Sequence, residues 1–131
     1  MEMSRGAIKK LDIRPTDPEM KVSVMSGGNQ QKVVLAKWLQ RDLKILIVDE
    51  PTAGIDVGAK DEIYKILEDL AAQGVLIILV SSDLRELIRL STRILVMRKG
   101  GIIREFREGN VSQDDVLAAA SGLGTEAGKN E

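Results

Sequence analysis

Apolar residues recur at helical spacing in two segments of the chain, residues 27–40 and 58–72. A repeat of three to four residues puts one stripe of side chains on one helical face, so both segments are predicted to be amphipathic helices. The predicted stripes are Val34, Leu35, Trp38 and Leu39 in the first helix, and Ile63, Ile66, Leu67, Leu70 and Ala71 in the second. Ser26 and Asp56 stand where N-caps are expected, and Gly74 stands where the second helix should stop.

The runs 45–48 and 75–80 are apolar throughout and predict buried strands, the first buried on both faces. Residues 93–97 and 102–106 predict a third and a fourth strand, and LRELIRL predicts a short helix between the second strand and the third. The order strand, helix, strand, helix, strand is typical of a parallel sheet with right-handed crossovers. The Gly100-Gly101 pair turns the third strand into the fourth, which predicts a hairpin. The predicted fold class is therefore α/β, with a parallel sheet core, crossover helices and a C-terminal β-hairpin.

The two ends of the chain differ from this pattern. Residues 1–22 are polar and interrupted by two prolines, so they are predicted to be an irregular lead-in that adds little to a core. Ser112 and Asp115 form a capping box that predicts a last helix. Residues 122–131 are predicted to be a disordered tail, which leaves 23–121 as the folded portion.

Composition narrows the possible chemistry. The formal net charge of the 131 residues is -1 and aromatic residues make up 2%, so neither a basic surface nor a stacking platform favours nucleic acid. The absence of cysteine and histidine excludes disulfides, thiolate metal sites and an imidazole base. The chain has no apolar signal core, and its longest clean apolar run, 75–80, is too short for a bilayer, so a cytoplasmic, soluble chain is expected.

Two places in the sequence carry candidate chemistry. Asp49 and Glu50 follow a buried strand, at the sheet edge where open α/β folds bind ligands, and carboxylates there suit a divalent metal and an attacking water. Ser26, Gly27 and Gly28 open a helix whose N–H groups and dipole suit a terminal phosphate. The residues themselves are equally compatible with solvated acids at a strand end, and with a plain N-cap followed by turn glycines.

Taken in order, these segments resemble the nucleotide-binding domain of ABC transporters. MSGGNQQ resembles the signature motif, ILIVDEP the Walker B strand and AGID the D-loop. The stretches SGGNQQKV, DEPTAGIDVGAKDEIY and LVSSDL, followed by RILVM and a glycine turn, are similar to the second ATP-binding half of bacterial monosaccharide importers of the ribose and galactose type. The resemblance covers roughly residues 20–121.

The resemblance implies roles for the carboxylates and for one serine. Asp49 would help to hold Mg²⁺, Glu50 would polarise the attacking water, and Asp56 would join two lobes while also capping a helix. Ser82 stands where most ABC ATPases have a histidine that senses the γ-phosphate, and a hydroxyl cannot supply imidazole chemistry. Serine there also fits the second half of the importer tandem, which suggests one impaired site.

The signature residues would serve a nucleotide held elsewhere. Ser26, Gly27 and Gly28 would contact the γ-phosphate of ATP bound to the opposite lobe, and Gln30 is a further candidate contact that could equally be a surface amide. The sequence G-x-x-x-x-G-K-[ST] does not occur in the chain, so no loop cradles the phosphates. The expected fold is therefore a partial P-loop NTPase (ABC ATPase) fold lacking the Walker A strand, loop and helix. The chain is expected to be a fragment that needs its full-length context for ATP, Mg²⁺ and activity.

The resemblance also implies partners. They are the remaining N-terminal part of the ATPase subunit and a membrane permease, with the protein peripheral on the inner face of the membrane. An unpaired sheet edge in such a fragment predicts self-association as a dimer or domain swap. One alternative function is a non-catalytic ABC-like protein-interaction module. Another, a chromosome-maintenance ATPase lobe, is disfavoured because the first 25 residues show no heptads.

Overall fold

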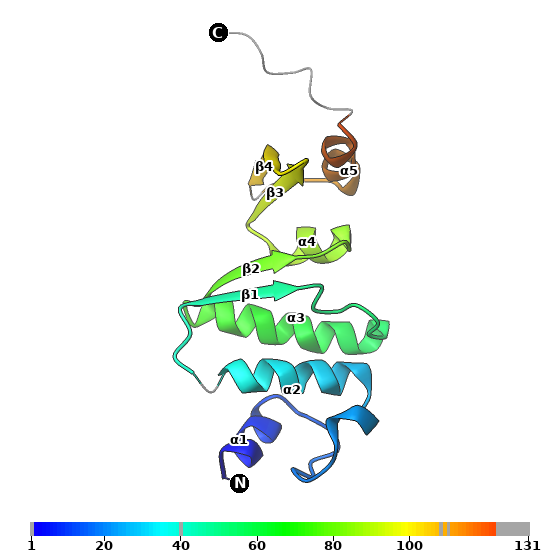
Figure 1. Ribbon diagram of the computed structural model, residues 1–131. Coiled ribbons are helices and arrows are strands. Elements are labelled where there is room, and N and C mark those ends of the chain that lie inside the picture. Colours follow the sequence, from blue (N-terminus) through cyan, green and yellow to red (C-terminus); the bar gives the residue numbers. More distant parts are fainter. Residues whose placement is uncertain (1, 40, 108, 110, 123–131) are drawn as a thin grey trace. The chain divides into compact units, whose positions relative to one another are not determined.

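The structure is a computed structural model that describes residues 2–39, 41–107, 109 and 111–122 (Figure 1). The chain divides into two compact units, Met1–Ile78 and Leu79–Glu131, and each is described by itself. The helices are α1 (Glu2–Lys10), the 3-10 turn η1 (Val22–Val24), α2 (Gly27–Leu39), α3 (Val57–Ala72), α4 (Leu84–Leu90) and α5 (Gln113–Ser121). The strands are β1 (Ile45–Asp49), β2 (Leu76–Val80), β3 (Arg93–Arg98) and β4 (Gly101–Arg107).

The prediction of an irregular lead-in over residues 1–22 is wrong for its first half, which forms helix α1. Both prolines follow this helix and so cannot interrupt it, and the Arg14–Pro15 peptide bond is cis. The lead-in also contributes to the core, because Leu11 and Ile13 are buried. The helical spacing of the apolar residues Ala7 and Leu11 was the signal for this helix.

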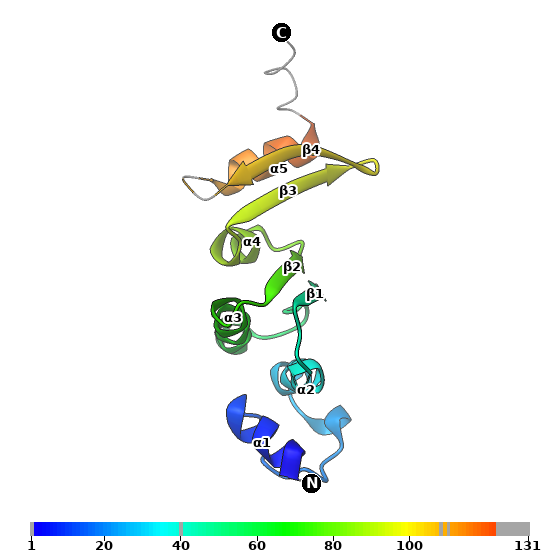
Figure 2. The ribbon, with the colours of Figure 1, turned by 90° about the vertical axis from the view of Figure 1, so that its left-hand side faces the viewer.

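Helices α2 and α3 form the centre of the first unit, where they lie side by side (Figure 2). Each predicted stripe is confirmed in part. In α3, four of the five predicted residues are buried, Ala71 is exposed and Tyr64 joins the buried set. In α2 the buried face is Gly28, Lys32, Leu35 and Ala36, whereas Val34 and Trp38 are exposed. The α2 face follows a repeat of four and three residues that begins at a glycine and includes a lysine, so apolarity alone misplaced it.

Strands β1 and β2 pair side by side and run in the same direction (Figure 1). Residues alternate along β1: Leu46 and Val48 are buried, while Ile45 and Ile47 are 55% and 67% exposed. In β2, Leu76, Ile78 and Val80 are exposed as well. The predictions that β1 is buried on both faces and that β2 is buried are therefore wrong. Helix α3 lies along one face of the pair, and among the described residues of the first unit no element covers the other (Figures 1 and 2).

The second unit contains an antiparallel hairpin of β3 and β4, in which Ile94 pairs with Phe106 and Arg98 with Gly101. Its two-residue loop is Lys99-Gly100, and both residues have positive φ, which is the signature of a type I′ turn. The sequence placed the turn one residue later. The predicted hairpin is confirmed, but within the described residues β3 pairs only with β4, so its expected place as a third parallel strand is wrong.

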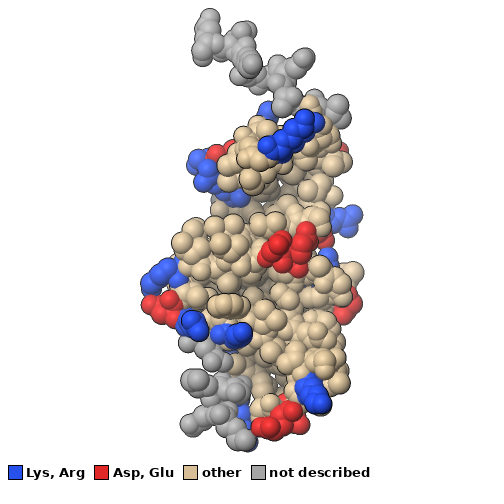
Figure 3. All heavy atoms as spheres, viewed as in Figure 1, with Lys and Arg blue, Asp and Glu red and all other residues tan. Residues whose placement is uncertain are grey.

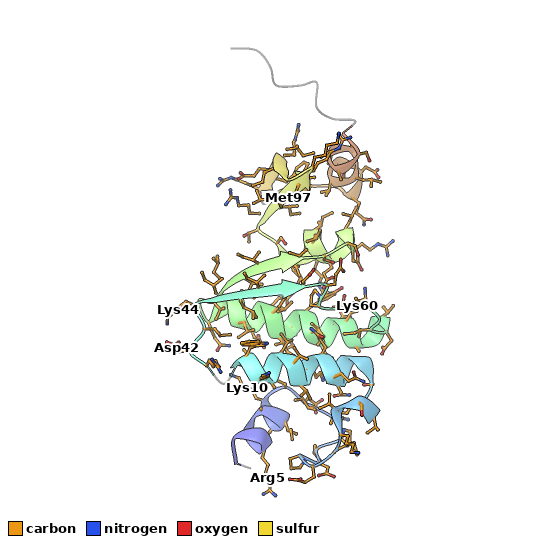
Figure 4. All side chains as sticks on the ribbon, viewed as in Figure 1. Arg5, Lys10, Asp42, Lys44, Lys60 and Met97 are labelled. Atoms are coloured by element: carbon orange, nitrogen blue, oxygen red, sulfur yellow. The ribbon has the colours of Figure 1, made fainter. Side chains whose placement is uncertain are left out.

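The hairpin packs one face against α5, and Val96, Val116 and Ala119 form the centre of this small core. The opposite face carries the exposed Met97, which Figure 4 labels. Ser112 and Asp115 form the predicted capping box, with Asp115 N–H donating to Ser112 Oγ at 3.1 Å. Helix α5 ends at Gly122, whose φ is positive, and the predicted disordered tail beyond it lies outside the described residues.

Candidate functional site

Ser26 occupies the N-cap of α2 and accepts two hydrogen bonds from one residue. Asn29 donates to Ser26 Oγ from its backbone N–H at 3.4 Å and from Nδ2 at 2.9 Å. The Asn29 amide is oriented by Arg14 N–H, which donates to Asn29 Oδ1 at 2.8 Å. Because both contacts fill acceptor positions on Ser26 Oγ, the hydroxyl hydrogen is directed to an acceptor outside this group, as contact with a phosphate oxygen requires.

The two glycines after Ser26 have different structural roles. A Cβ on Gly28 would lie 2.8 Å from Ala59 Cβ, so glycine is needed for the close approach of α2 to α3. A Cβ on Gly27 would meet only ordinary contacts, the nearest being Gly54 O at 3.5 Å. Packing therefore explains Gly28, which is buried, but leaves Gly27 unexplained. Gly27 is the better indicator of a ligand that approaches the backbone closely.

The same contacts join two segments that the sequence had singled out separately. Gly27 and Gly28 lie against Gly54, Ile55 and Ala59. Gly54 has a φ of 69°, and Asp56 caps α3 by accepting from Ala59 N–H at 3.1 Å. The start of α2 and the residues 54–56 thus form one continuous surface, which we call the signature surface.

Asp49 and Glu50 lie at the end of β1, at the other end of the loop that leads to Asp56. Glu50 adopts a φ of 47°, an uncommon conformation for a side-chain-bearing residue and one that is enriched at functional sites. After it, Pro51 and Thr52 are buried and anchor the turn. Figure 3 shows acidic side chains near this end of β1, with mostly uncharged surface directly around them and other charged side chains farther away.

The carboxylates of Asp49 and Glu50 suit an Mg²⁺ ion that arrives bound to a nucleotide. Within the described residues no group of three or more Asp, Glu, His or Cys side chains converges on one point. Mg²⁺ is usually held by one or two carboxylates together with water and phosphate oxygens, rather than by an all-protein cage. Asp49, which is exposed, matches that arrangement, so the donor set is compatible with Mg-ATP and does not form a resident metal site.

Two further predicted contacts are placed differently. Gln30 turns its amide inward, donating from Nε2 to Met25 O at 2.9 Å, which gives it a local role in holding the chain before α2. Ser82 is exposed and belongs to the second unit, where it is the second residue after β2. The structure thus places the glycines that follow Ser26 against the residues that precede Asp56, whereas Ser82 belongs to the other unit.

Three residues near the predicted site carry contacts that the sequence analysis missed. Asn29 orients Ser26, as described above. Lys32 is 3% exposed, and its Nζ donates to Asp12 O at 2.8 Å and pairs with Glu62 Oε2 at 2.6 Å, which ties α2 to α3 and to the chain after α1. Glu86 is 1% exposed in α4. For Lys32 the available signal was its place four residues after Gly28, on the same helical face.

Comparison with known proteins shows which proteins this chain is similar to. The family model described as "ABC transporter" matches residues 2–53. Solved structures confirm the fold class: the ADP conformation of an ATP-binding cassette of an ABC transporter aligns with a TM-score of 0.74 at 22% identity over 95% of this chain and 47% of that one. A dimeric bacterial ABC transporter cassette aligns with a TM-score of 0.71 at 24% identity, over 84% of this chain and 47% of that one. The described chain thus has part of the ABC ATPase fold.

The curated relatives that this chain resembles are sugar import ATP-binding proteins. The chain is 54% identical over 87% of its length to a xylose import ATP-binding protein of Geobacillus kaustophilus. It is 50% identical over 88% of its length to a ribose import ATP-binding protein of Shouchella clausii, and 46% identical over 89% to an arabinose import ATP-binding protein of Pseudomonas savastanoi. The resemblance to the ATP-binding proteins of monosaccharide importers is therefore confirmed. The chain spans 23% of the length of each of these three relatives.

Proposed function

We propose that this chain supplies the signature motif, the Walker B strand end and the D-loop to an ATP sandwich in the ATP-binding subunit of a monosaccharide ABC importer. The observation that carries the proposal is the signature surface, in which Gly27, the residue after Ser26, lies beside Gly54 and Ile55. Identities of 46% to 54% with the three sugar import proteins support the substrate class.

In this proposal each site residue has one task. Ser26 donates its hydroxyl, and Gly27 its backbone N–H, to the γ-phosphate of ATP held by an opposing lobe. Asp49 contributes a ligand to the Mg²⁺ that accompanies a nucleotide, and Glu50 polarises the water that attacks the phosphate. The bound Mg²⁺ would neutralise phosphate charge. Because the chain contains no G-x-x-x-x-G-K-[ST] sequence, we expect no ATP hydrolysis by the chain alone.

The proposal includes the partners that this task requires. They are a segment that carries the phosphate loop and a membrane permease, which would place the protein at the inner face of the membrane. Among the described residues no helix is both long enough and apolar enough to cross a bilayer. We expect the chain by itself to associate with a second copy through the exposed face of β1 and β2, because Ile47 and its neighbours leave apolar surface in water. Light scattering should then report a dimer that Ile47→Lys dissociates, whereas a wild-type monomer would contradict self-association.

The catalytic part is tested by joining this chain to an upstream segment that carries a phosphate loop, taken from the Geobacillus kaustophilus relative. We expect Mg-ATP hydrolysis that falls by about 100-fold or more in Glu50→Gln, since a lost general base costs factors of this size. Gly27→Ala should also lower the rate. Gly6→Ala is its matched control, because a Cβ at Gly6 meets nothing within 4 Å.

Three results would contradict the proposal. Hydrolysis unaffected by Glu50→Gln would mean that Glu50 does not polarise the attacking water. Equal rates of hydrolysis for Gly27→Ala and Gly6→Ala would mean that the signature surface takes no part in the reaction. A joined protein that folds but does not hydrolyse ATP would instead favour the alternative, a non-catalytic module that uses the same surface for protein contacts.

A further inference from the structure

A buried carboxyl group lies in the second unit, outside the residues to which the proposed function gives a task. Glu86, in the short helix α4, is 1% exposed. Burying a carboxyl group is unfavourable unless hydrogen bonds compensate for the lost water. One of these bonds comes from Ser81, whose hydroxyl donates to Glu86 Oε2 at 2.7 Å. Glu86 therefore holds Ser81, which lies on the loop between β2 and α4.

The donor and the acceptor of each hydrogen bond in this loop can be assigned. Asp83 N–H donates to Ser81 Oγ at 3.0 Å, and because a backbone N–H can only donate, Ser81 is the acceptor there. The single hydroxyl hydrogen of Ser81 is then the one that Glu86 receives. The Asp83 carboxylate in turn accepts from Arg85 N–H at 3.0 Å and from Glu86 N–H at 3.4 Å. Both neighbours of Ser82 are thus fixed to α4.

The two adjacent serines are consequently not equivalent. Ser81 is half-buried and commits its hydrogen to Glu86, whereas Ser82 is exposed. From the sequence alone either serine of the pair could face a ligand. The loop geometry distinguishes them.

We propose that Glu86 is a positioning residue which, through Ser81, holds the loop 81–83 so that Ser82 alone of the two serines faces outward at the end of β2. The nucleotide-related part of this inference rests on the proposed function and on the resemblance, which implies that Ser82 stands at the γ-phosphate-sensing position. The loop geometry itself does not depend on nucleotide.

The geometry is tested in the chain itself by amide hydrogen exchange. Glu86→Ala should accelerate exchange of the Asp83 amide by about tenfold, the effect of losing one hydrogen bond, while Glu86→Gln, which keeps an acceptor for Ser81, should leave it within about twofold of wild type. The amides of the β3–β4 hairpin serve as the internal reference. If Glu86→Ala does not fold, Glu86→Leu replaces it, because leucine fills the buried position but offers Ser81 no acceptor. Wild-type exchange at Asp83 in these variants, or acceleration in Glu86→Gln, would overturn the inference.

The functional consequence is tested in the joined protein by measuring the Kd for Mg-ATP in a double-mutant cycle. If Glu86 acts through Ser82, Ser82→Ala weakens binding in the wild-type background but adds nothing in Glu86→Ala. Additive effects would overturn the positioning role. No effect of Ser82→Ala in any background would contradict the proposed function of Ser82, while the exchange result would still decide the loop geometry.

Discussion

The α2–α3 contact and the β1–β2 pair belong to the same unit but differ in how completely they are packed. Gly28 and Ala59 meet so closely that no Cβ fits between them, and Lys32 is buried with two partners. On the strand pair, by contrast, Ile47 is 67% exposed and Leu76 is 58% exposed. The α2–α3 contact is closely packed, whereas the β1–β2 pair leaves an apolar face exposed to solvent.

The two regions differ in whether the chain itself provides the packing: it does so at the α2–α3 contact, but not at the exposed face of the strand pair. The signature surface rests on the α2–α3 contact, so its geometry is set within the chain. An exposed apolar face of this kind marks a place where other protein packs. In the proposed function the missing packing and the missing phosphate loop come from the same source, the rest of the ATPase subunit.

The largest expected effect contrasts the two faces of β1. Leu46→Ala should lower the free energy of unfolding by about 3 kcal/mol, because it removes buried methyl groups and leaves a cavity. At a protein concentration low enough to keep the chain monomeric, Ile47→Ala should cost less than about 1 kcal/mol, because its side chain is then in water. Urea unfolding of both variants measures the difference. Equal costs would mean that the exposed face is covered in solution.

A second comparison concerns the buried lysine. Lys32→Ala should cost about 2 kcal/mol, because it leaves Asp12 O without this donor, with the ion-pair part reduced since Glu62 is half exposed. Lys37→Ala, on the exposed side of the same helix, is the matched control and should change stability by less than about 0.5 kcal/mol. If the two lysine variants unfold at the same urea concentration, α2 is not tied to α3 by Lys32.

The paired glycines sharpen the comparison within α2. Gly28→Ala should cost about 1.5 kcal/mol, because the added methyl group would meet Ala59 Cβ at 2.8 Å and push the helices apart. Gly27→Ala should be neutral to within about 0.5 kcal/mol, since its Cβ meets ordinary contacts. Thermal unfolding of both variants checks this. A neutral Gly28→Ala would show that the α2–α3 contact is looser than described.

The smallest effect lies in the second unit, at the capping box of α5. Ser112→Ala should cost about 1 kcal/mol, the usual value of a lost N-cap. The hydrogen bond from the Ser112 hydroxyl, helped by the one from its backbone N–H, lowers the pKa of Asp115. Stability from this contact is therefore fully present above the unfolded pKa of about 3.9 and is lost as the pH falls through the lower folded value. Acid titration of stability should be shallower in Ser112→Ala, and an unchanged slope would contradict the assignment.

Predictions from the sequence succeeded where one local signal decides the structure. The caps Ser26, Asp56 and Ser112, the hairpin and the order of elements all follow from short-range chemistry. Burial could not be read in the same way, because it depends on what packs outside a segment. Ile47 is as apolar as Leu46 but faces away from α3, and Lys32 occupies a buried helical position that an apolar pattern does not mark.

The candidate site was predictable to a similar extent. The identities of Ser26, Asp49 and Glu50 follow from their motifs. That Gln30 donates to Met25 O could not be foreseen, because nothing in the sequence fixes the direction of an amide. The same holds for the loop between β2 and α4, where the hydrogen bonds of Ser81 and the exposure of Ser82 distinguish two identical neighbours. The Asp42–Lys44 ion pair before β1 (Figure 4) does not help to define the site, because both side chains are exposed and such pairs contribute little to stability.

The central claim is that this chain completes a nucleotide site whose phosphate loop lies in another segment. Its most direct test is calorimetric titration of Mg-ATP into the chain alone and into the chain joined to a segment with a phosphate loop. The account predicts no measurable heat of binding for the chain alone, and binding by the joined protein that Gly27→Ala weakens. Micromolar binding by the chain alone, abolished by Asp49→Ala, would contradict the account and would mean that these residues form a complete nucleotide site by themselves.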